Sequence, residues 1–159
     1  MRSFAPPLAC LWALVGITAA TASEPVSTVR IEQAWARATP PGVNVGAAYA
    51  VISNRGAADR LVAVESTLSE QVEIHNSSQQ AGRMQMRPVA EVDVPAGGRV
   101  VFEPGGSHLM LIDLKRPLRQ GELLSMTFVF ANAGRLTVQL PVAPIGSTQA
   151  PTSAHDHHH

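Results

Sequence analysis

Turns recur along most of this chain at intervals of roughly ten residues, and they divide it into short segments. Pro and Gly mark them clearly at residues 39–42, 95–98 and 104–106. The segments between turns are short and apolar or alternate apolar with polar residues, and no long stretch shows the period of a helix. This pattern predicts an all-β sandwich or barrel.

A series of short strands is expected, and we assign them to one domain. The segments with strand patterns are residues 29–36, 47–53, 60–65, 71–75, 84–89, 92–94, 99–102, 108–114, 123–130 and 136–142. A chain of 159 residues holds one domain comfortably and two only with difficulty. We therefore predict a single all-β domain over residues 23–143.

The first 22 residues have the features of a secretory signal. Arg2 supplies a positive start, residues 8–20 form an apolar run, and Ala20 and Ala22 are the small residues that a signal peptidase recognises. The run is shorter than the about 20 apolar residues that a membrane-spanning helix needs. We expect cleavage after Ala22, a periplasmic location, and no membrane span in the mature chain.

Cysteine content and charge exclude several functions. Cys10 is the only cysteine, and it lies inside the predicted signal, where Pro7 replaces the Leu that a lipoprotein signal requires. The mature chain therefore has no disulfide, thiolate ligand or cysteine nucleophile. The 12 Lys and Arg residues balance the 12 Asp and Glu residues, which argues against nucleic acid as a partner.

Histidines and methionines cluster in the predicted domain. Only two of the six histidines, His75 and His108, lie there, and three of the five methionines, Met84, Met86 and Met110, lie close to them in the sequence. Residues two apart in a strand share a face at a spacing of about 7 Å. His108 and Met110 are therefore expected to project together, and so are Met84 and Met86. His75 is expected to end its strand.

This set of side chains favours copper, although each residue also has an ordinary explanation. A lone histidine usually lies at a surface, and a lone methionine usually fills a core. Thioethers are soft ligands and imidazole is borderline, so two of each suit Cu(I). Zn(II) seldom takes methionine, and calcium and magnesium prefer oxygen. A blue-copper site needs a thiolate, so the pattern indicates a carrier instead of an electron-transfer protein.

The run from His75 to Met110 resembles the PCuAC family of periplasmic copper chaperones. The family motif is His, ten residues, Met, twenty-one residues, His, one residue and Met, and His75, Met86, His108 and Met110 match it without a gap. The flanking segments that are also similar are residues 34–42, 86–89, 94–98 and 114–118. Asn76 is a departure, because many relatives carry a second methionine or an acidic residue there.

The resemblance implies a fold, a ligand set and partners. The fold is a cupredoxin-like Greek-key β-sandwich with copper at one exposed end. The implied Cu(I) ligands are His75, Met86, His108 and Met110. Met84 is not part of the motif, but it shares a strand face with Met86 and is expected to be a reserve ligand. The implied role is delivery of Cu(I) toward the Cu(A) centre of cytochrome c oxidase. A Sco-type thiol protein or the Cu(A)-bearing oxidase subunit would be the partner.

Two other functions are considered. A periplasmic copper buffer or resistance protein would bind the metal in the same way without delivering it, and the sequence does not separate it from a chaperone. A metalloenzyme would need an open coordination position and a base. None of the four motif residues is a carboxylate. Glu73 and Asp113 are nearby in sequence, but Glu73 shares a strand face with His75 only by its spacing. We therefore expect a protein that is not an enzyme.

The C-terminal segment is a second candidate for metal binding. Residues 144–154 are rich in Gly, Ser, Thr and Pro, which is typical of a flexible tail. The candidate ligands that follow are His155, His157, His158 and His159. The alternatives are a fragment of an expression tag and a solvated end with no role. A tag is usually an uninterrupted run of histidines, whereas Asp156 interrupts this one. Nitrogen and oxygen ligands suit Cu(II), so we predict a Cu(II) site in the tail.

Overall fold

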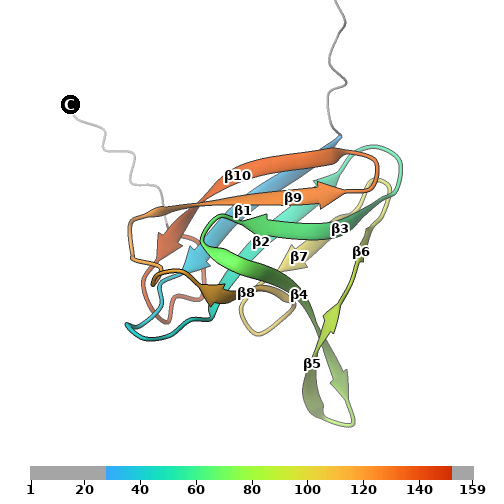
Figure 1. Cartoon of the computed structure of the whole chain (residues 1–159). Coiled ribbons are helices and arrows are strands. Elements are labelled where there is room, and N and C mark those ends of the chain that lie inside the picture. Colours follow the sequence, from blue (N-terminus) through green and yellow to red (C-terminus); the bar gives the residue numbers. More distant parts are fainter. Residues whose placement is uncertain (1–27, 152–159) are drawn as a thin grey trace, which may run out of the picture.

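The computed structural model describes residues 28–151, which form ten β-strands and no helix (Figure 1). The strands are β1 (Val29–Arg37), β2 (Gly46–Asn54), β3 (Asp59–Ser66), β4 (Ser69–Gln80), β5 (Arg83–Val89), β6 (Val92–Val94), β7 (Arg99–Phe102), β8 (His108–Leu114), β9 (Leu123–Phe130) and β10 (Gly134–Ala143). The all-β prediction is confirmed. The predicted signal and the four tail histidines lie outside the described residues.

The strands form one continuous sheet in the order β5-β4-β8-β2-β1-β10-β9-β3-β6, with β7 also paired to β2. A short parallel pairing, Ala36 with Val142 and Arg37 with Ala143, joins β1 to β10. It connects the first half of the sheet, β5-β4-β8-β2-β1 with β7, to the second half, β10-β9-β3-β6. The other pairings are antiparallel. Because neighbours in the sheet are often distant in sequence, the chain crosses between the two halves, as in a Greek key.

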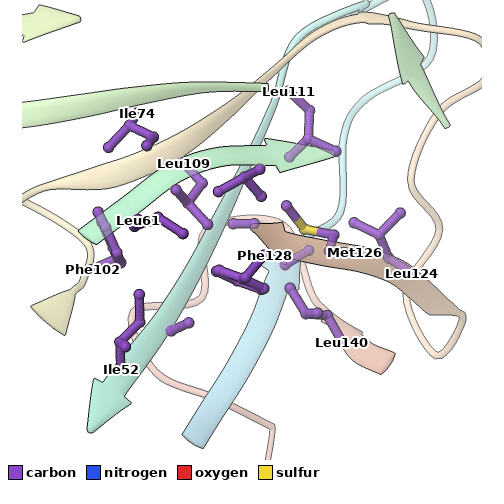
Figure 2. Close-up of a cluster of buried hydrophobic side chains, with 14 of the residues drawn as sticks. Ile52, Leu61, Ile74, Phe102, Leu109, Leu111, Leu124, Met126, Phe128 and Leu140 are labelled. Carbon is purple, nitrogen blue, oxygen red and sulfur yellow. The ribbon is translucent and has the colours of Figure 1, made fainter. Parts of the chain in front are cut away.

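The hydrophobic core draws on both halves of the sheet (Figure 2). In β9, alternate residues such as Met126 and Phe128 are fully buried. From the other half, Ile74 of β4 and Leu109 and Leu111 of β8 enter the same cluster. Since side chains alternate along a strand, the neighbours of these three residues in β4 and β8 point to the opposite, outward face.

Strand β4 is longer than the sequence predicts. The strand was expected over residues 71–75, but it continues to Gln80, so the prediction that His75 ends a strand is wrong. Beyond His75, β4 pairs only with β5, and the two strands form a ribbon that projects from the body (Figure 1). The polar residues of this ribbon have no core to face, so their sequence lacks the apolar alternation of a buried strand.

The turn of the ribbon explains how the two strands stay in register. Ala81 and Gly82 have φ angles of 49° and 75°, the left-handed conformation that a tight two-residue hairpin turn requires at both positions. The turn pairs Gln80 with Arg83 and, farther along, Ser77 with Met86. The ribbon thereby brings methionines of β5 back toward the histidine of β4.

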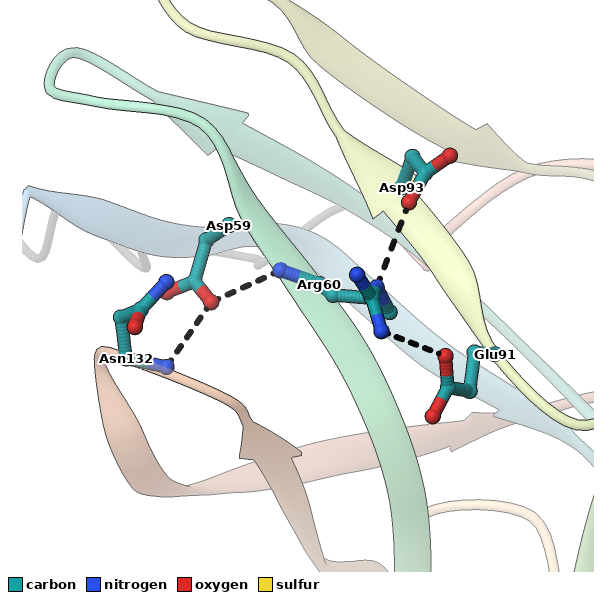
Figure 3. A network of polar contacts seen from close by, with 5 residues as sticks. All are labelled: Asp59, Arg60, Glu91, Asp93 and Asn132. Atoms are coloured by element: carbon teal, nitrogen blue, oxygen red, sulfur yellow. Dashed lines mark hydrogen bonds and ion pairs between the residues drawn. The ribbon is translucent and has the colours of Figure 1, made fainter.

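Asp59 organises one end of the second half of the sheet (Figure 3). Its carboxylate accepts hydrogen bonds from the backbone N–H groups of Arg60, Asn132 and Ala133, at 2.7, 2.9 and 2.8 Å. Burial alone would raise the pKa of Asp59, but these backbone donors outweigh it and hold the pKa below the ordinary value. The Arg60 guanidinium then reaches Glu91 at 2.9 Å.

The segment after β10 packs back on the outward face of β1 and β2. Nε and Nη2 of Arg37 donate hydrogen bonds to the Ser147 carbonyl oxygen at 3.1 and 2.7 Å. Ala150 packs against the small cluster that contains Trp35 and Tyr49. The chain therefore leaves the described region beside this cluster. No helix within residues 28–151 is long and apolar enough to cross a membrane.

Candidate metal centre

His75 and His108 lie directly opposite each other in the antiparallel pair of β4 and β8. Their ring centroids are 5.3 Å apart, with the planes tilted by 45°. With a metal–nitrogen bond of about 2 Å, two imidazoles on one tetrahedral ion have ring centroids about 5 Å apart. The observed spacing therefore fits two rings that bind a single ion.

A methionine lies on each side of this histidine pair. Met110 of β8 is opposite Glu73, which precedes His75 by two residues in β4 on the side of the body. Met86 of β5 is opposite Ser77, which follows His75 by two residues on the side of the ribbon. Directly opposed residues in a sheet point to the same face, so all of these side chains share the outward face. The structure thus brings the four residues of the sequence motif together on one face.

The methionines differ in exposure. Met110 is half-buried in the sheet, whereas Met86 is 49% exposed. Met84 lies one step farther along the ribbon, opposite Gln79, and is 58% exposed. Its sulfur accepts a hydrogen bond from the Ser77 hydroxyl at 2.7 Å. Met84 is therefore held against β4 on the ligand face, in a position to replace Met86.

Glu73 belongs to this group of side chains, and the sequence interpretation gave it no role. Its Oε2 atom lies 2.8 Å from Nε2 of His75. The signal that could have identified it was the spacing of two residues in a strand, which places both side chains on one face. The rings of the two histidines thus have different partners, since Nδ1 of His108 faces the Gly106 carbonyl oxygen at 3.3 Å.

Asn76, the departure from the family motif, serves the site from the opposite face. Its Oδ1 atom accepts a hydrogen bond from the Ser107 hydroxyl at 2.9 Å. The Ser107 hydroxyl oxygen in turn accepts one from the backbone N–H of Ser77 at 3.3 Å. These bonds tie the turn that precedes His108 to β4, and they fix the start of β8 at the root of the ribbon.

The donor set of the site is chemically soft. Within residues 28–151, no three imidazole, thiol or carboxylate side chains converge in a group that could hold a metal ion. A metal at the histidine pair therefore depends on the neighbouring thioethers, which suit Cu(I) and seldom bind Zn(II). The candidate ligands in the tail lie outside the described residues, so their Cu(II) site stays a prediction.

Comparison with protein families gives a match over nearly all of the described chain. Residues 29–142 match the family described as "Putative lipoprotein LpqE-like". The "Putative lipoprotein Lxx21020" of Leifsonia xyli subsp. xyli is 29% identical over 127 residues, which cover 79% of this chain and 75% of that protein. Protein RP573 of Rickettsia prowazekii is 30% identical over 128 residues, with 74% and 67% covered.

Solved structures with the same fold include copper-bound ones. The apo PCuAC domain of PmoF2 superposes with a TM-score of 0.68 at 28% identity, over 78% of this chain and 96% of that domain. Its copper-bound form gives 0.64 at 29% identity, over 74% and 94%. The Cu(I) form of DR1885 from Deinococcus radiodurans gives 0.56 at 26% identity, over 77% and 81%. The cupredoxin-like fold predicted from the sequence is confirmed.

Proposed function

Since the chain belongs to the LpqE-like family and shares its fold with copper-binding PCuAC domains, we propose that it is a Cu(I) metallochaperone of the periplasm. The observation that carries the proposal is the paired His75 and His108, whose ring centroids are 5.3 Å apart. Met110 and Met86 lie on either side of them on the same face. The proposed Cu(I) ligands are these four side chains.

The uneven burial of the proposed ligands favours transfer of the metal. His75 and Met110 lie in the sheet, while Met86 is on the exposed ribbon. A partner protein can therefore displace the Met86 thioether first, while the body-side ligands still hold the ion. Without a thiolate, the site also lacks the ligand that blue-copper proteins use for rapid electron transfer. Both properties suit a carrier better than an enzyme.

The acceptor follows from the family resemblance. We propose delivery toward the Cu(A) centre of cytochrome c oxidase, to the Cu(A)-bearing subunit or to a Sco-type protein. The predicted secretory signal and the lipoprotein description of the family support an exported location. A copper buffer would use the same ligands, so the distinction lies in transfer and has to be tested as such.

The tail is proposed to supply copper to the same face. Ala47 packs against the cluster of Trp35 and Tyr49, as Ala150 does, and Ala47 is the β2 partner of Met110. The described chain thus ends on the face that carries the proposed site. An extended chain advances about 3.5 Å per residue, so the histidines that follow start within reach of that face. They would capture Cu(II) or hold Cu(I) weakly.

The test is a transfer experiment with the mature chain. Cu(I)-loaded protein is mixed with the metal-free Cu(A) domain of an oxidase, alone and with a Sco-type protein. The Cu(A) absorption is read after a mild oxidant has removed the one electron that converts two bound Cu(I) ions into the mixed-valence centre. If the protein is a chaperone, it transfers its copper to an acceptor faster than a small chelator of equal Cu(I) affinity does, because the chelator must first release the ion into solution. A protein that keeps its copper in both mixtures is a buffer. His108→Ala is the control that should carry no copper.

A further inference from the structure

We infer that Glu73 is a positioning residue that makes Nδ1 of His75 the copper-binding nitrogen, whereas His108 binds through Nε2. This inference rests on the proposed copper site. A carboxylate can only accept hydrogen bonds, so the nitrogen of His75 that contacts Glu73 at 2.8 Å must carry the proton. In a neutral imidazole the other nitrogen, Nδ1, is then the one with a free lone pair.

The same reasoning gives the opposite result for His108. The carbonyl oxygen of Gly106 lies 3.3 Å from Nδ1 and can only accept. Nδ1 of His108 is therefore the protonated nitrogen, and Nε2 is left for the metal. The partners come from two structural sources, a strand neighbour for His75 and the preceding turn for His108. The two rings are thus oriented by different contacts although they are paired across the sheet.

Glu73 is placed to orient a ligand and not to be one. It does not form a three-residue metal-holding group with the two histidines, since no such group occurs among residues 28–151. Its hydrogen bond to His75 matches the common arrangement in which a metal-bound histidine donates its other N–H to a carboxylate. That arrangement fixes the ring and raises the basicity of the ligating nitrogen.

The charge of Glu73 also matches the proposed metal. Two neutral imidazoles and two thioethers leave the single positive charge of Cu(I) uncompensated. The half-buried carboxylate of Glu73 balances that charge at the distance of one imidazole ring. Glu73 therefore stabilises a bound cation in a site that is partly shielded from water.

The experiment reads the tautomers directly and separates this inference from the copper proposal. Long-range 1H–15N NMR is recorded on the mature protein without metal, above the usual imidazole pKa of about 6.5. We expect His75 with its proton on Nε2 and His108 with its proton on Nδ1. Addition of Cu(I), which is diamagnetic, should shift the Nδ1 resonance of His75. A proton on Nδ1 of His75, or a Cu(I) shift at its Nε2, would overturn the inference.

Variants then test the carboxylate itself. Glu73→Ala should give His75 a mixture of tautomers and lower the Cu(I) affinity about 10–100-fold, measured by competition with bicinchoninate. Glu73→Gln keeps an acceptor without the charge, so it should keep the tautomer and lose less affinity. Glu70→Ala removes a carboxylate of β4 that is 69% exposed, and it should change neither property. If Glu73→Ala behaves like Glu70→Ala, Glu73 has no positioning role. If wild-type protein binds no Cu(I), the proposed function fails, while the tautomers of the metal-free protein still decide this inference.

Discussion

The two faces of β4 and β8 share one backbone but contain different chemistry. On the inward face, Ile74, Leu109 and Leu111 are at most 4% exposed and belong to the core. On the outward face, alternate residues of the same strands place His75 and His108 opposite each other. The inward face holds the strands in place, and the outward face uses that fixed spacing. Stability and metal binding should therefore respond to different substitutions.

The largest expected effect is on the inward face. Leu109→Ala should lower the free energy of unfolding by about 2–5 kcal/mol, because it removes a fully buried side chain and leaves a cavity. Urea unfolding followed by circular dichroism measures this loss. Copper-saturated protein should recover part of it, about 2.7 kcal/mol at a hundredfold excess over the dissociation constant. If Leu109→Ala lost Cu(I) binding but kept the wild-type free energy of unfolding, the two faces would not have the separate roles that we infer.

On the outward face, His108→Ala should abolish one Cu(I) equivalent and leave the fold intact. The loss of Cu(I) affinity should exceed the about 10–100-fold loss that is usual when a residue that hydrogen-bonds to a metal ligand is removed. X-ray absorption on the wild-type protein should show both nitrogen and sulfur neighbours around copper, and a spectrum without sulfur contradicts the ligand set. The metal-free variant and wild type should have the same urea midpoint.

Asp59 tests a part of the body that carries no proposed ligand. Asp59→Ala should cost about 1–3 kcal/mol, because three backbone N–H groups lose their acceptor. The pKa of Asp59 in the fold lies below its ordinary value, so its contribution is complete above the pKa of the unfolded chain and is lost as the pH falls through the lower, folded pKa. Urea midpoints of variant and wild type should thus converge in acid. Cu(I) affinity at neutral pH should be equal in both.

The ribbon should show a smaller effect than the histidine pair. Met86→Leu keeps the shape of the side chain but removes the thioether, and Met84 lies one step away on the same face. Cu(I) affinity should fall less than in His108→Ala, and the double variant Met84→Leu, Met86→Leu should fall further than either single one. If the loss of Cu(I) binding energy in the double variant equals the sum of the losses in the two single variants, Met84 does not replace Met86.

The smallest effect on the core site is expected from the tail. Truncation after Ala154 removes the four tail histidines and should leave Cu(I) affinity unchanged. It should remove a second, weaker equivalent of Cu(II) and its paramagnetic resonance signal. The tail needs neutral imidazoles, so this equivalent should weaken as the pH falls through about 6.5. A truncated chain that binds the second Cu(II) as well as the full chain does contradicts a role for the tail.

The sequence by itself determined the strands that face the core. Segments such as β7 to β9 begin and end where the turn residues and the alternation predict, because burial of one face imposes a period of two on the apolar residues. The resemblance supplied the four candidate ligands through their spacing. Alternation within β8 was enough to place His108 and Met110 on one face.

Only the tertiary structure decided how the separate strands meet at the site. The second half of β4 was not predicted from the sequence because that half pairs with β5 in a polar ribbon. The ribbon is held by backbone hydrogen bonds and buries no face, so its residues do not alternate between apolar and polar. The pairing of His75 with His108 depends on the register of strands about thirty residues apart, which a local pattern does not specify. The contact of Glu73 with His75 likewise depends on side-chain direction, which follows from burial of the opposite face against the second half of the sheet.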